Sequence, residues 1–500
     1  MARKNPLSDA ALELIARRFA VLADDLDNAR SWAREDFAMV NGTTVFPYPE
    51  GLGFDFAATV RVTTEPGWRV ATGMRPAGLP NTFTESTYHD LVDMPVFIGR
   101  FDLDSVMVEQ RVMRVASWPE GSFRGAERLA LLRQLGQMVP PMAKVFGETP
   151  WDHYTTLLLF EPGFGGASAL EHQNSHIGIY SPQLVGSVIL PMITAHEIFH
   201  AWNVKRLRPA DLWPYRYDQA QPTTWLWVSE GLTEYYADLS LVRGGVVDSL
   251  GWLGLTQEKI DQMNEAPPTA LEDASLSTWV TPTDGSAYVY YPKGGLVGLL
   301  LDILIRDLTD NTQSLDGVLR ALYQSAWQQG RGFTAAEWWD AVRAAAGGAS
   351  FDGFAAKYVD GREPLPWSEV LPKAGLRVVA DTVRDPWIGV STSTDTSGAI
   401  VLEVFPASMA ARAGVQVGDR LLSVGGVPAT SEDFWLEYRD RYATQAEGTP
   451  VELVLMRGAD QLTLRGPLAL LIRPIDRLEF DPAADARAVR LRQGLLRGSP

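Results

Sequence analysis

The chain has 500 residues, more than one ordinary hydrophobic core can hold, so we expect two to four domains. Its hydrophobic fraction of 46% and charged fraction of 21% are typical of a soluble globular protein, and its net charge of -17 argues against nucleic acid or an anionic membrane as a partner. The absence of cysteine excludes a disulfide framework, a thiolate zinc site and a cysteine nucleophile, which leaves histidine and carboxylate side chains as metal ligands.

No stretch of the sequence predicts a membrane-spanning helix. The longest apolar runs, 185–195 and 296–304, are too short or are bounded by charged residues. The N-terminal segment does not match a signal peptide, because Glu13, Arg17 and Arg18 interrupt its apolar residues. We therefore expect a cytoplasmic protein, or a periplasmic one if the native N-terminus lies upstream of Met1.

Residues 1–145 predict a β-rich domain. Alternating residues over 56–63, with turn signals at Asn41-Gly42 and Pro66-Gly67, are typical of short strands. No titratable cluster with the spacing of metal ligands occurs in this part of the sequence. We expect a sandwich-like domain without catalytic residues.

Residues 146–375 predict a mainly helical domain. A helix is expected over about 224–242, where Gly244-Gly245 provides its end. Thr334 and Glu337 form the two ends of a capping box that opens a later helix. The proline-rich stretch 364–375 predicts a linker.

A second β-rich unit is expected over 385–470, followed by a C-terminal tail over 471–500. Apolar residues alternate from 400 to 404, residues 451–455 predict a strand, and residues 430–433 can cap a helix. The tail is rich in charge, so we expect it to be peripheral.

The pentapeptide His-Glu-Ile-Phe-His at residues 196–200 carries the strongest chemical signal. His196 and His200 are four residues apart, so on a helix both imidazoles lie on one face and can bind one zinc ion. Pro191 suits the first turn of that helix, and Glu197 can act on a metal-bound water. The alternative is a packed helix that carries two histidines without a metal.

A carboxylate on the next predicted helix can complete the zinc site. Glu230 and Glu234 are one turn apart, and Asp238 continues the same face. We predict Glu230 as the third ligand and Glu234 as the carboxylate that orients a histidine ligand. The alternative is a solvated acidic stripe, which the neighbouring Trp225 and Trp227 argue against.

With zinc bound, Glu197 is the natural general base for hydrolysis of a peptide bond. A tetrahedral oxyanion needs a second electrophile beside the metal, and Tyr291 is our candidate. A tyrosine that only packs its ring is the alternative for Tyr291.

Several segments across the chain share a resemblance to one family. They are NGTTVFPYPEG, EPGWRVATG, YHDLVDMPV, HEIFHAWNVKRLRP, SEGLTEYYADL, YYPKGG and SMAARAGVQVGDRLLSVGG. Together they resemble the glycyl aminopeptidase family of PDZ-containing zinc metallopeptidases, which are gluzincins related distantly to aminopeptidase N and thermolysin. The resemblance implies a multidomain α+β protein with an N-terminal β domain, a thermolysin-like helical catalytic domain and a C-terminal PDZ-like domain.

The same resemblance implies roles for individual residues. His196, His200 and Glu230 become the ligands of one zinc ion per chain, Glu197 the base and Tyr291 the oxyanion stabiliser. The tyrosine falls two residues before a Lys-Gly pair, as in the YxKG motif of the related aminopeptidases.

A further motif bears on which end of the substrate is cut. Residues 165–172 read GGASALEH and resemble the GGLEH loop of the family, which corresponds to the GxMEN exopeptidase loop of aminopeptidase N. By this resemblance Glu171 holds the substrate's free α-amine, and a fixed anion there enforces N-terminal trimming. The alternative is an exposed loop carboxylate.

The PDZ-like unit permits two interpretations. Residues 387–390 (WIGV) can form a backbone loop that captures a peptide C-terminus. Residues 414–419 resemble a turn of the family that has a structural role. The unit can therefore also be a structural domain that binds no peptide.

We predict a zinc-dependent aminopeptidase that acts on peptide substrates, and the preference for N-terminal Gly or Ala rests on the resemblance alone. One alternative is a zinc endopeptidase whose PDZ-like domain presents the substrate. The other is a catalytically silent peptide-binding scaffold.

Overall fold

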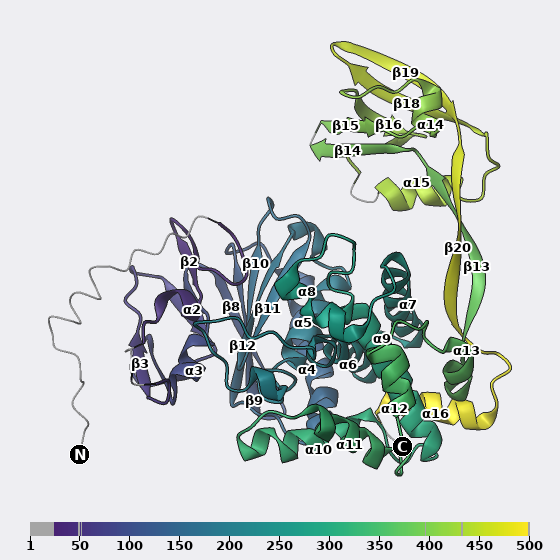
Figure 1. Ribbon diagram of the computed structural model, residues 1–500. Coiled ribbons are helices and arrows are strands. Elements are labelled where there is room, and N and C mark those ends of the chain that lie inside the picture. Colours follow the sequence, from purple (N-terminus) through teal and green to yellow (C-terminus); the bar gives the residue numbers. More distant parts are fainter. Residues whose placement is uncertain (1–24, 49–50, 52, 396, 432–433, 499–500) are drawn as a thin grey trace, which may run out of the picture. The chain divides into compact units, whose positions relative to one another are not determined.

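The computed structural model describes residues 25–48, 51, 53–395, 397–431 and 434–498. It divides into two compact units (Figure 1). The first comprises residues up to Arg377 together with Leu478–Pro500, and the second is Val378–Arg477. Among the described residues, no helix is long and apolar enough to cross a membrane.

The first unit begins with two small antiparallel sheets. The four-stranded sheet has the order β1-β2-β7-β4 and the three-stranded sheet the order β3-β6-β5. The elements of this part are β1 (Trp32–Arg34), β2 (Phe37–Val40), α2 (Gly42–Val45), β3 (Ala58–Arg61), β4 (Arg69–Thr72), β5 (Arg75–Pro76), β6 (Thr82–Glu85), α3 (Tyr88–Val92) and β7 (Val96–Gly99). Trp32, Phe37 and Phe97 are buried in one cluster with Leu157 and Ile177, so these strands share a core with the sheet that follows.

A five-stranded sheet of order β11-β12-β10-β9-β8 comes next. Its strands are β8 (Asp102–Val108), β9 (Arg111–Trp118), β10 (His153–Phe160), β11 (Ala167–His172) and β12 (Ser175–Tyr180). Strand β10 runs parallel to β9 and β12, whereas β8 and β11 are antiparallel edge strands. Helix α4 (Gly125–Phe146) makes the crossover from β9 to β10. The strands after residue 146 lie in a part for which we predicted a mainly helical pattern.

The rest of the first unit is helical. Its elements are η1 (Pro182–Leu184), α5 (Ile189–Phe199), η2 (Ala210–Leu212), η3 (Trp227–Gly231), α6 (Leu232–Arg243), α7 (Ser249–Glu265), α8 (Leu271–Val280), α9 (Tyr290–Leu308), α10 (Leu315–Ser325), η4 (Trp327–Gln329), α11 (Ala335–Ala345), α12 (Asp352–Phe354), η5 (Ala355–Val359), α13 (Trp367–Val370), η6 (Leu371–Ala374) and α16 (Ala486–Arg497). Helix α5 contacts β11 and β12 as well as α6, so it lies between the sheet and the helices (Figure 1). The predicted capping box of Thr334 and Glu337 is confirmed at the start of α11.

Three predicted segments differ from the structure. The helix expected over 224–242 begins with a π-helical turn, η3, before it continues as α6. The expected linker 364–375 is instead short helix, and Val370 and Leu371 in it are buried. The end of the chain is not peripheral, because β20 leads back to the first unit and α16 packs on α6, α9 and η6.

Glycines allow the central helices to approach closely. A Cβ atom added to Gly231 would lie 2.6 Å from Cα of Gly294, and one added to Gly294 would lie 2.9 Å from the carbonyl oxygen of Trp227. Only residues without side chains permit this contact between η3 and α9. Glu230 and Tyr291, on either side of this contact, are thereby brought near each other.

The second unit is a sheet of order β14-β15-β16-β18-β19, with β17 paired to β16. Its elements are β13 (Leu376–Trp387), β14 (Val390–Asp395), β15 (Gly398–Val404), α14 (Met409–Ala413), β16 (Arg420–Val424), β17 (Val427–Pro428), α15 (Phe434–Tyr442), β18 (Pro450–Arg457), β19 (Asp460–Pro467) and β20 (Ala469–Phe480). Strands β13 and β20 pair with each other where the chain enters and leaves the unit. Of the predicted cap at 430–433, residues 432–433 lie outside the described residues.

Both predicted PDZ segments have defined conformations. Gly389, between β13 and β14, has φ of 77°, and its carbonyl oxygen accepts a hydrogen bond from the backbone N–H of Phe405 at 2.9 Å. In the turn over 414–419, the Asp419 carboxylate accepts the backbone N–H of Gln416 at 2.8 Å and pairs with Arg457 at 2.7 Å. The turn is held by its own hydrogen bonds, as a structural role requires.

Candidate metal centre and active site

The zinc motif lies on α5, a helix that is buried almost throughout. Pro191 lies in its first turn, as predicted, and His200 follows its last residue as the C-cap. Both His196 and His200 are buried. Since the two imidazoles are one turn apart, they face the same point beside the following helix.

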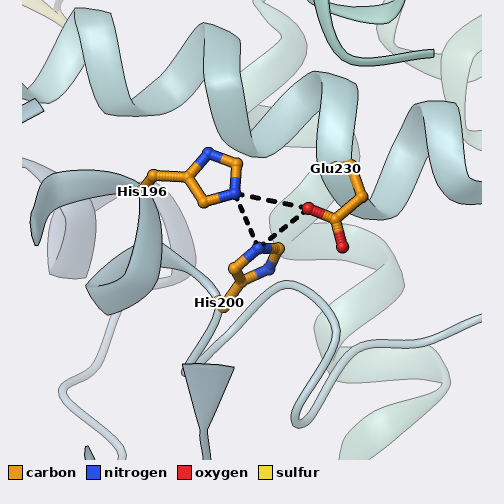
Figure 2. Close-up of side chains that lie close together, drawn as sticks. All are labelled: His196, His200 and Glu230. Atoms are coloured by element: carbon orange, nitrogen blue, oxygen red, sulfur yellow. Dashed lines mark hydrogen bonds and ion pairs between the residues drawn. The ribbon is translucent and has the colours of Figure 1, made fainter. Parts of the chain in front are cut away.

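Three ligand atoms converge at that point, as Figure 2 shows. The Nε2 atoms of His196 and His200 are 2.9 Å apart, and Oε2 of Glu230 lies 3.3 and 3.1 Å from them. Glu230 lies in the π-helical turn η3. Such a turn contains one more residue than an α-helical turn and is often found at a functional site. Among the described residues, these three form a group that could hold a metal ion.

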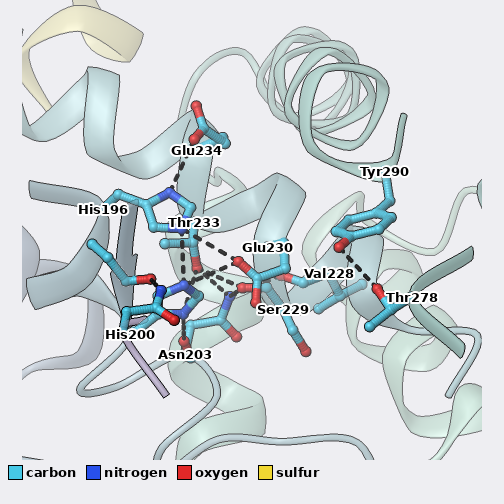
Figure 3. Close-up of polar contacts among 12 residues, drawn as sticks. His196, His200, Asn203, Val228, Ser229, Glu230, Thr233, Glu234, Thr278 and Tyr290 are labelled. Carbon is cyan, nitrogen blue, oxygen red and sulfur yellow. Dashed lines mark hydrogen bonds and ion pairs between the residues drawn. The ribbon is translucent and has the colours of Figure 1, made fainter. Parts of the chain in front are cut away.

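The outer nitrogens of both imidazoles already face hydrogen-bond acceptors (Figure 3). Nδ1 of His200 donates to the carbonyl oxygen of Asn203 at 2.8 Å, and Nδ1 of His196 faces Oε1 of Glu234 at 3.1 Å. The proton of a neutral imidazole is therefore on Nδ1, so each Nε2 presents an electron pair.

This donor set fits a divalent cation. Two nitrogen electron pairs and a carboxylate oxygen converge in a buried place, where they repel each other unless a positive charge lies among them. The pKa of His196 indicates the same need for a positive charge. Burial lowers this pKa, but the carboxylates of Glu230 and Glu234 raise it well above its usual value. Two histidines and one glutamate are a ligand set typical of catalytic zinc.

Glu234 belongs to a buried network of charged side chains that the sequence did not predict. Its Oε2 lies 3.1 Å from Nζ of Lys259, which also contacts Oδ2 of Asp238 at 2.7 Å. Burial alone would raise the pKa of Glu234, but Lys259 and His196 outweigh burial and hold the pKa well below its usual range. Asp238 shares the helical face of Glu230, yet it contacts Lys259 and no histidine ligand.

The carboxyl group of Glu197 is buried beside the ligands. Its Oε2 has no hydrogen-bond partner among the described residues, and burial raises the pKa of Glu197 to about 8. A carboxylate with a raised pKa is a stronger base than one in water. The backbone of the same residue is fixed, because its carbonyl oxygen accepts from Oη of Tyr154 at 3.3 Å.

Tyr291 lies at the first turn of α9, with its ring centroid 6.0 Å from that of His196. Burial raises the pKa of Tyr291 well above its usual value, so the hydroxyl keeps its proton and can donate a hydrogen bond. The neighbouring Tyr290 is engaged elsewhere, with its hydroxyl 3.1 Å from that of Thr278 (Figure 3). Of these two tyrosines, Tyr291 is the one placed beside the ligands.

Glu171 lies on the edge strand β11, opposite His176 of β12. Burial is the main cause of the raised pKa values of Tyr291 and Glu197. The negative charge of Glu171 raises both pKa values further. The carboxylate of Glu171 therefore acts on the same site as the predicted base. It is half-buried on a strand rather than fully exposed in a loop.

A second buried cluster fixes the end of β11. Asp93 lies 2.6 Å from Nζ of Lys205 and 3.4 Å from Nδ1 of His172, and it accepts the backbone N–H of Gln173 at 2.7 Å. Burial opposes ionisation of Asp93, but Lys205 and His172 lower its pKa to about 2. The cluster thus connects the segment after the zinc motif to the strand that carries Glu171, a contact that no local sequence pattern indicated.

Two family models match the first unit, one over residues 190–297 and one over residues 7–100. The first describes the M61 glycyl aminopeptidase and the second the N-terminal domain of peptidase M61. Both segments belong to the M61 glycyl aminopeptidase family. The matched segment 190–297 contains His196, His200, Glu230 and Tyr291, so this M61 site is that of a metallopeptidase of the aminopeptidase type.

A third family model, for a PDZ domain, matches residues 400–457 of the second unit. The predicted multidomain α+β fold, with an N-terminal β domain, a helical central part and a C-terminal PDZ domain, is therefore confirmed.

A solved structure shares the fold of this chain. An aminopeptidase N family protein from Idiomarina loihiensis is 21% identical, with a TM-score of 0.72, over 95% of this chain and 85% of that one. An M1 zinc metallopeptidase from Deinococcus radiodurans is 17% identical, with a TM-score of 0.48, over 69% of this chain and 75% of that one.

One curated relative matches over a short stretch. The periplasmic pH-dependent serine endoprotease DegQ of Escherichia coli K12 is 38% identical over 91 residues. The chain spans about a fifth (19%) of the length of that relative, and the match takes up 18% of this chain.

Proposed function

We propose that the protein is a zinc-dependent aminopeptidase that removes small N-terminal residues, Gly or Ala, from peptides. The observation that carries the proposal is the convergence of His196, His200 and Glu230 beside Glu197, whose Oε2 has no hydrogen-bond partner among the described residues. The preference for Gly or Ala is supported only by the family to which the catalytic segment belongs.

His196, His200 and Glu230 would hold one zinc ion per chain. When bound, zinc would polarise the scissile carbonyl and lower the pKa of a coordinated water molecule towards neutrality. The contact between Glu234 and Nδ1 of His196 supports the predicted role of Glu234, orienting a histidine ligand. It keeps the proton of His196 on the side away from the metal.

Glu197 acts as the general base. Its buried carboxylate takes a proton from the attacking water and passes it to the leaving amine, so one group serves both steps of the hydrolysis. The position of Glu197 between the two histidine ligands in the sequence of the zinc motif supports this role.

Tyr291 and Glu171 complete the proposal. The protonated hydroxyl of Tyr291 donates to the carbonyl oxygen as negative charge develops on it. Glu171, whose charge acts on the same site, accepts the substrate's α-ammonium group and so restricts cleavage to the first peptide bond.

The PDZ domain is proposed to bind the C-terminus of a peptide through the backbone around Gly389. Peptides are then partners of both units, and no nucleic acid is expected. The compartment stays a prediction from the sequence, cytoplasmic, with the periplasm as the alternative.

Digestion of a peptide library, read by mass spectrometry with and without a chelator, tests the function. We expect loss of one N-terminal residue, mostly Gly or Ala, only when zinc is present. Glu197→Gln should bind zinc with wild-type stoichiometry and lose roughly 100-fold or more in turnover, the scale of general base catalysis. Equal cleavage of N-acetylated and free peptides would show an endopeptidase, and near-normal turnover of Glu197→Gln would contradict the mechanism.

A further inference from the structure

A cavity of about 490 Å³ adjoins the proposed zinc site. It shares Glu234 and Tyr291 with that site, and its other walls come from the end of α7 and from the segment just before α9. The proposed mechanism uses no group on these other walls. Gln262, Glu265 and Tyr288 are the polar side chains that they contribute.

Tyr288 is held at this cavity in a strained conformation. Its φ of 64° lies in the left-handed region, which a bulky residue rarely adopts. The side chain is 61% exposed, and its ring lies 6.2 and 6.5 Å from the rings of Tyr290 and Tyr291. Strain of this kind persists where the surroundings enforce it, often at ligand sites. The result is an aromatic wall with one accessible ring.

Glu265 supplies an anion at the same cavity. It is exposed and is the last residue of α7, where the helix dipole disfavours a negative charge. Among the ion pairs of the described residues, none involves Glu265, whereas Glu234 is paired with Lys259. The cavity therefore combines an unneutralised carboxylate with an exposed aromatic ring, two groups that both attract a cation.

Glu171 does not line this cavity, whereas Tyr291 lines it and also lies beside the ligands. Glu234, in the cavity wall, contacts His196 at 3.1 Å, so the cavity adjoins the ligands. A substrate with its amine at Glu171 and its first carbonyl at the three ligands then continues towards the cavity. The side chain that reaches it belongs to the second residue, which follows the scissile bond.

We propose that this cavity is a subsite for a lysine or arginine side chain at the second position of the substrate, bound between Tyr288 and Glu265. The inference rests on the proposed aminopeptidase function and adds a substrate class to it. The net charge of -17 acts in the same direction, because it attracts cationic peptides.

The test compares C-terminally amidated tripeptides, Gly-Lys-Ala, Gly-Met-Ala and Gly-Glu-Ala, so that the PDZ domain has no carboxylate to bind. We expect kcat/KM to be highest for lysine and lowest for glutamate. Glu265→Gln and Tyr288→Gly should each reduce the value for Gly-Lys-Ala about fivefold, and each should reduce it more than the value for Gly-Met-Ala. Glycine is used because it accepts the positive φ, and Tyr288→Phe, which keeps the ring, should keep the preference for lysine.

Glu369→Gln is the matched control, since Glu369 is exposed and does not line the cavity. It removes the same charge from the chain and should leave all three rates unchanged. Equal rates for the lysine and glutamate peptides, or a preference for lysine at the first position, would overturn the subsite while leaving the aminopeptidase intact. No release of glycine from any of the three would instead contradict the proposed function.

Discussion

At the scale of single residues, Glu171 is the one that we propose sets which end of a peptide is cut. The ligands and Glu197 suit cleavage of any peptide bond, and they do not distinguish the end of a chain from its middle. In the proposed function, a half-buried carboxylate on an edge strand, whose charge acts on the predicted base, adds that distinction. An ammonium group gains a charge-assisted hydrogen bond there, and a blocked amine does not.

Glu171→Gln is therefore expected to reduce kcat/KM for peptides with a free N-terminus by about 10- to 100-fold. Its effect on N-acetylated peptides should be small, because these cannot form the ion pair. Steady-state kinetics on matched free and acetylated peptides measures both. Equal losses on the two series would remove Glu171 as the amine anchor.

The residues of the site were predicted from sequence to very different degrees. His196 and His200 share one helix, so their spacing alone placed them together. Glu230 needed a second helix, yet its aromatic neighbours already argued for burial. Lys259 could not be foreseen, because it meets Glu234 only through the packing of α7 on α6.

At the scale of elements, α7 contributes Lys259 to the surroundings of the zinc ligands. Lys259 is buried between Glu234 and Asp238, and its side chain passes close to Gly295 of α9, where an added Cβ would lie 3.4 Å from Cδ. Three helices thus meet at one lysine. Its charge favours the ionised form of Glu234, which in turn fixes the orientation of His196.

Lys259→Met should weaken zinc binding by about 10- to 100-fold, because the carboxylate that orients His196 loses its counter-ion. Competition with a chromogenic chelator measures the affinity. Lys259→Arg keeps the positive charge and should therefore recover part of the zinc affinity. Wild-type affinity in the methionine variant would show that Glu234 needs no partner.

The glycine contact between η3 and α9 gives a second prediction. Gly294→Ala places a Cβ atom 2.9 Å from the carbonyl oxygen of Trp227, so the two elements must separate. We expect a loss of about 1–3 kcal/mol in stability, and up to roughly 100-fold in activity, since Glu230 and Tyr291 lie on opposite sides of the contact.

Gly254→Ala on α7 is the control for that substitution. An added Cβ at Gly254 meets no atom within 4 Å, and alanine favours helix, so stability should stay the same or rise by about 1 kcal/mol. Thermal unfolding and zinc-dependent hydrolysis report the two effects separately. Wild-type stability and activity in Gly294→Ala would show that the two helices can move apart without a loss of free energy.

Local signals predicted elements well, and packing decided the rest. The capping box at Thr334 was foreseen because its two side chains bond within four residues. The stretch 364–375 was predicted as a linker from its prolines, but Val370 and Leu371 are buried. The π-helical turn at Glu230 has no sequence signature that we could use, since it depends on the contact with α9.

At the scale of the whole molecule, the PDZ domain is an insertion between two parts of one folded unit. The chain leaves the first unit at Arg377 and returns at Leu478, and the two ends are close, because Arg377 pairs with Glu479. All the site residues proposed for hydrolysis lie in the first unit. An insertion at a surface point leaves the host fold intact.

Replacement of residues 378–477 by a short glycine turn should therefore leave kcat/KM for tripeptides within roughly twofold of the wild-type value. Truncation after residue 477 should behave differently, because it removes α16 with the buried Leu491 and Leu495. Burial of two leucines contributes about 3–6 kcal/mol, so the truncated protein should unfold at a clearly lower temperature. Equal stability of the two variants would contradict the role of α16.

The position of α16 also sets an order of events during synthesis. The ribosome completes the zinc ligands and the whole PDZ sequence before it reaches the helix that covers α6 and α9. Nascent domains fold as units while the chain grows, so the catalytic part exists for a time with an apolar surface uncovered. A protein interrupted by breakage or premature termination inside the PDZ domain would keep that surface exposed. Quality-control proteases would then meet an incomplete peptidase as a substrate rather than as a working enzyme.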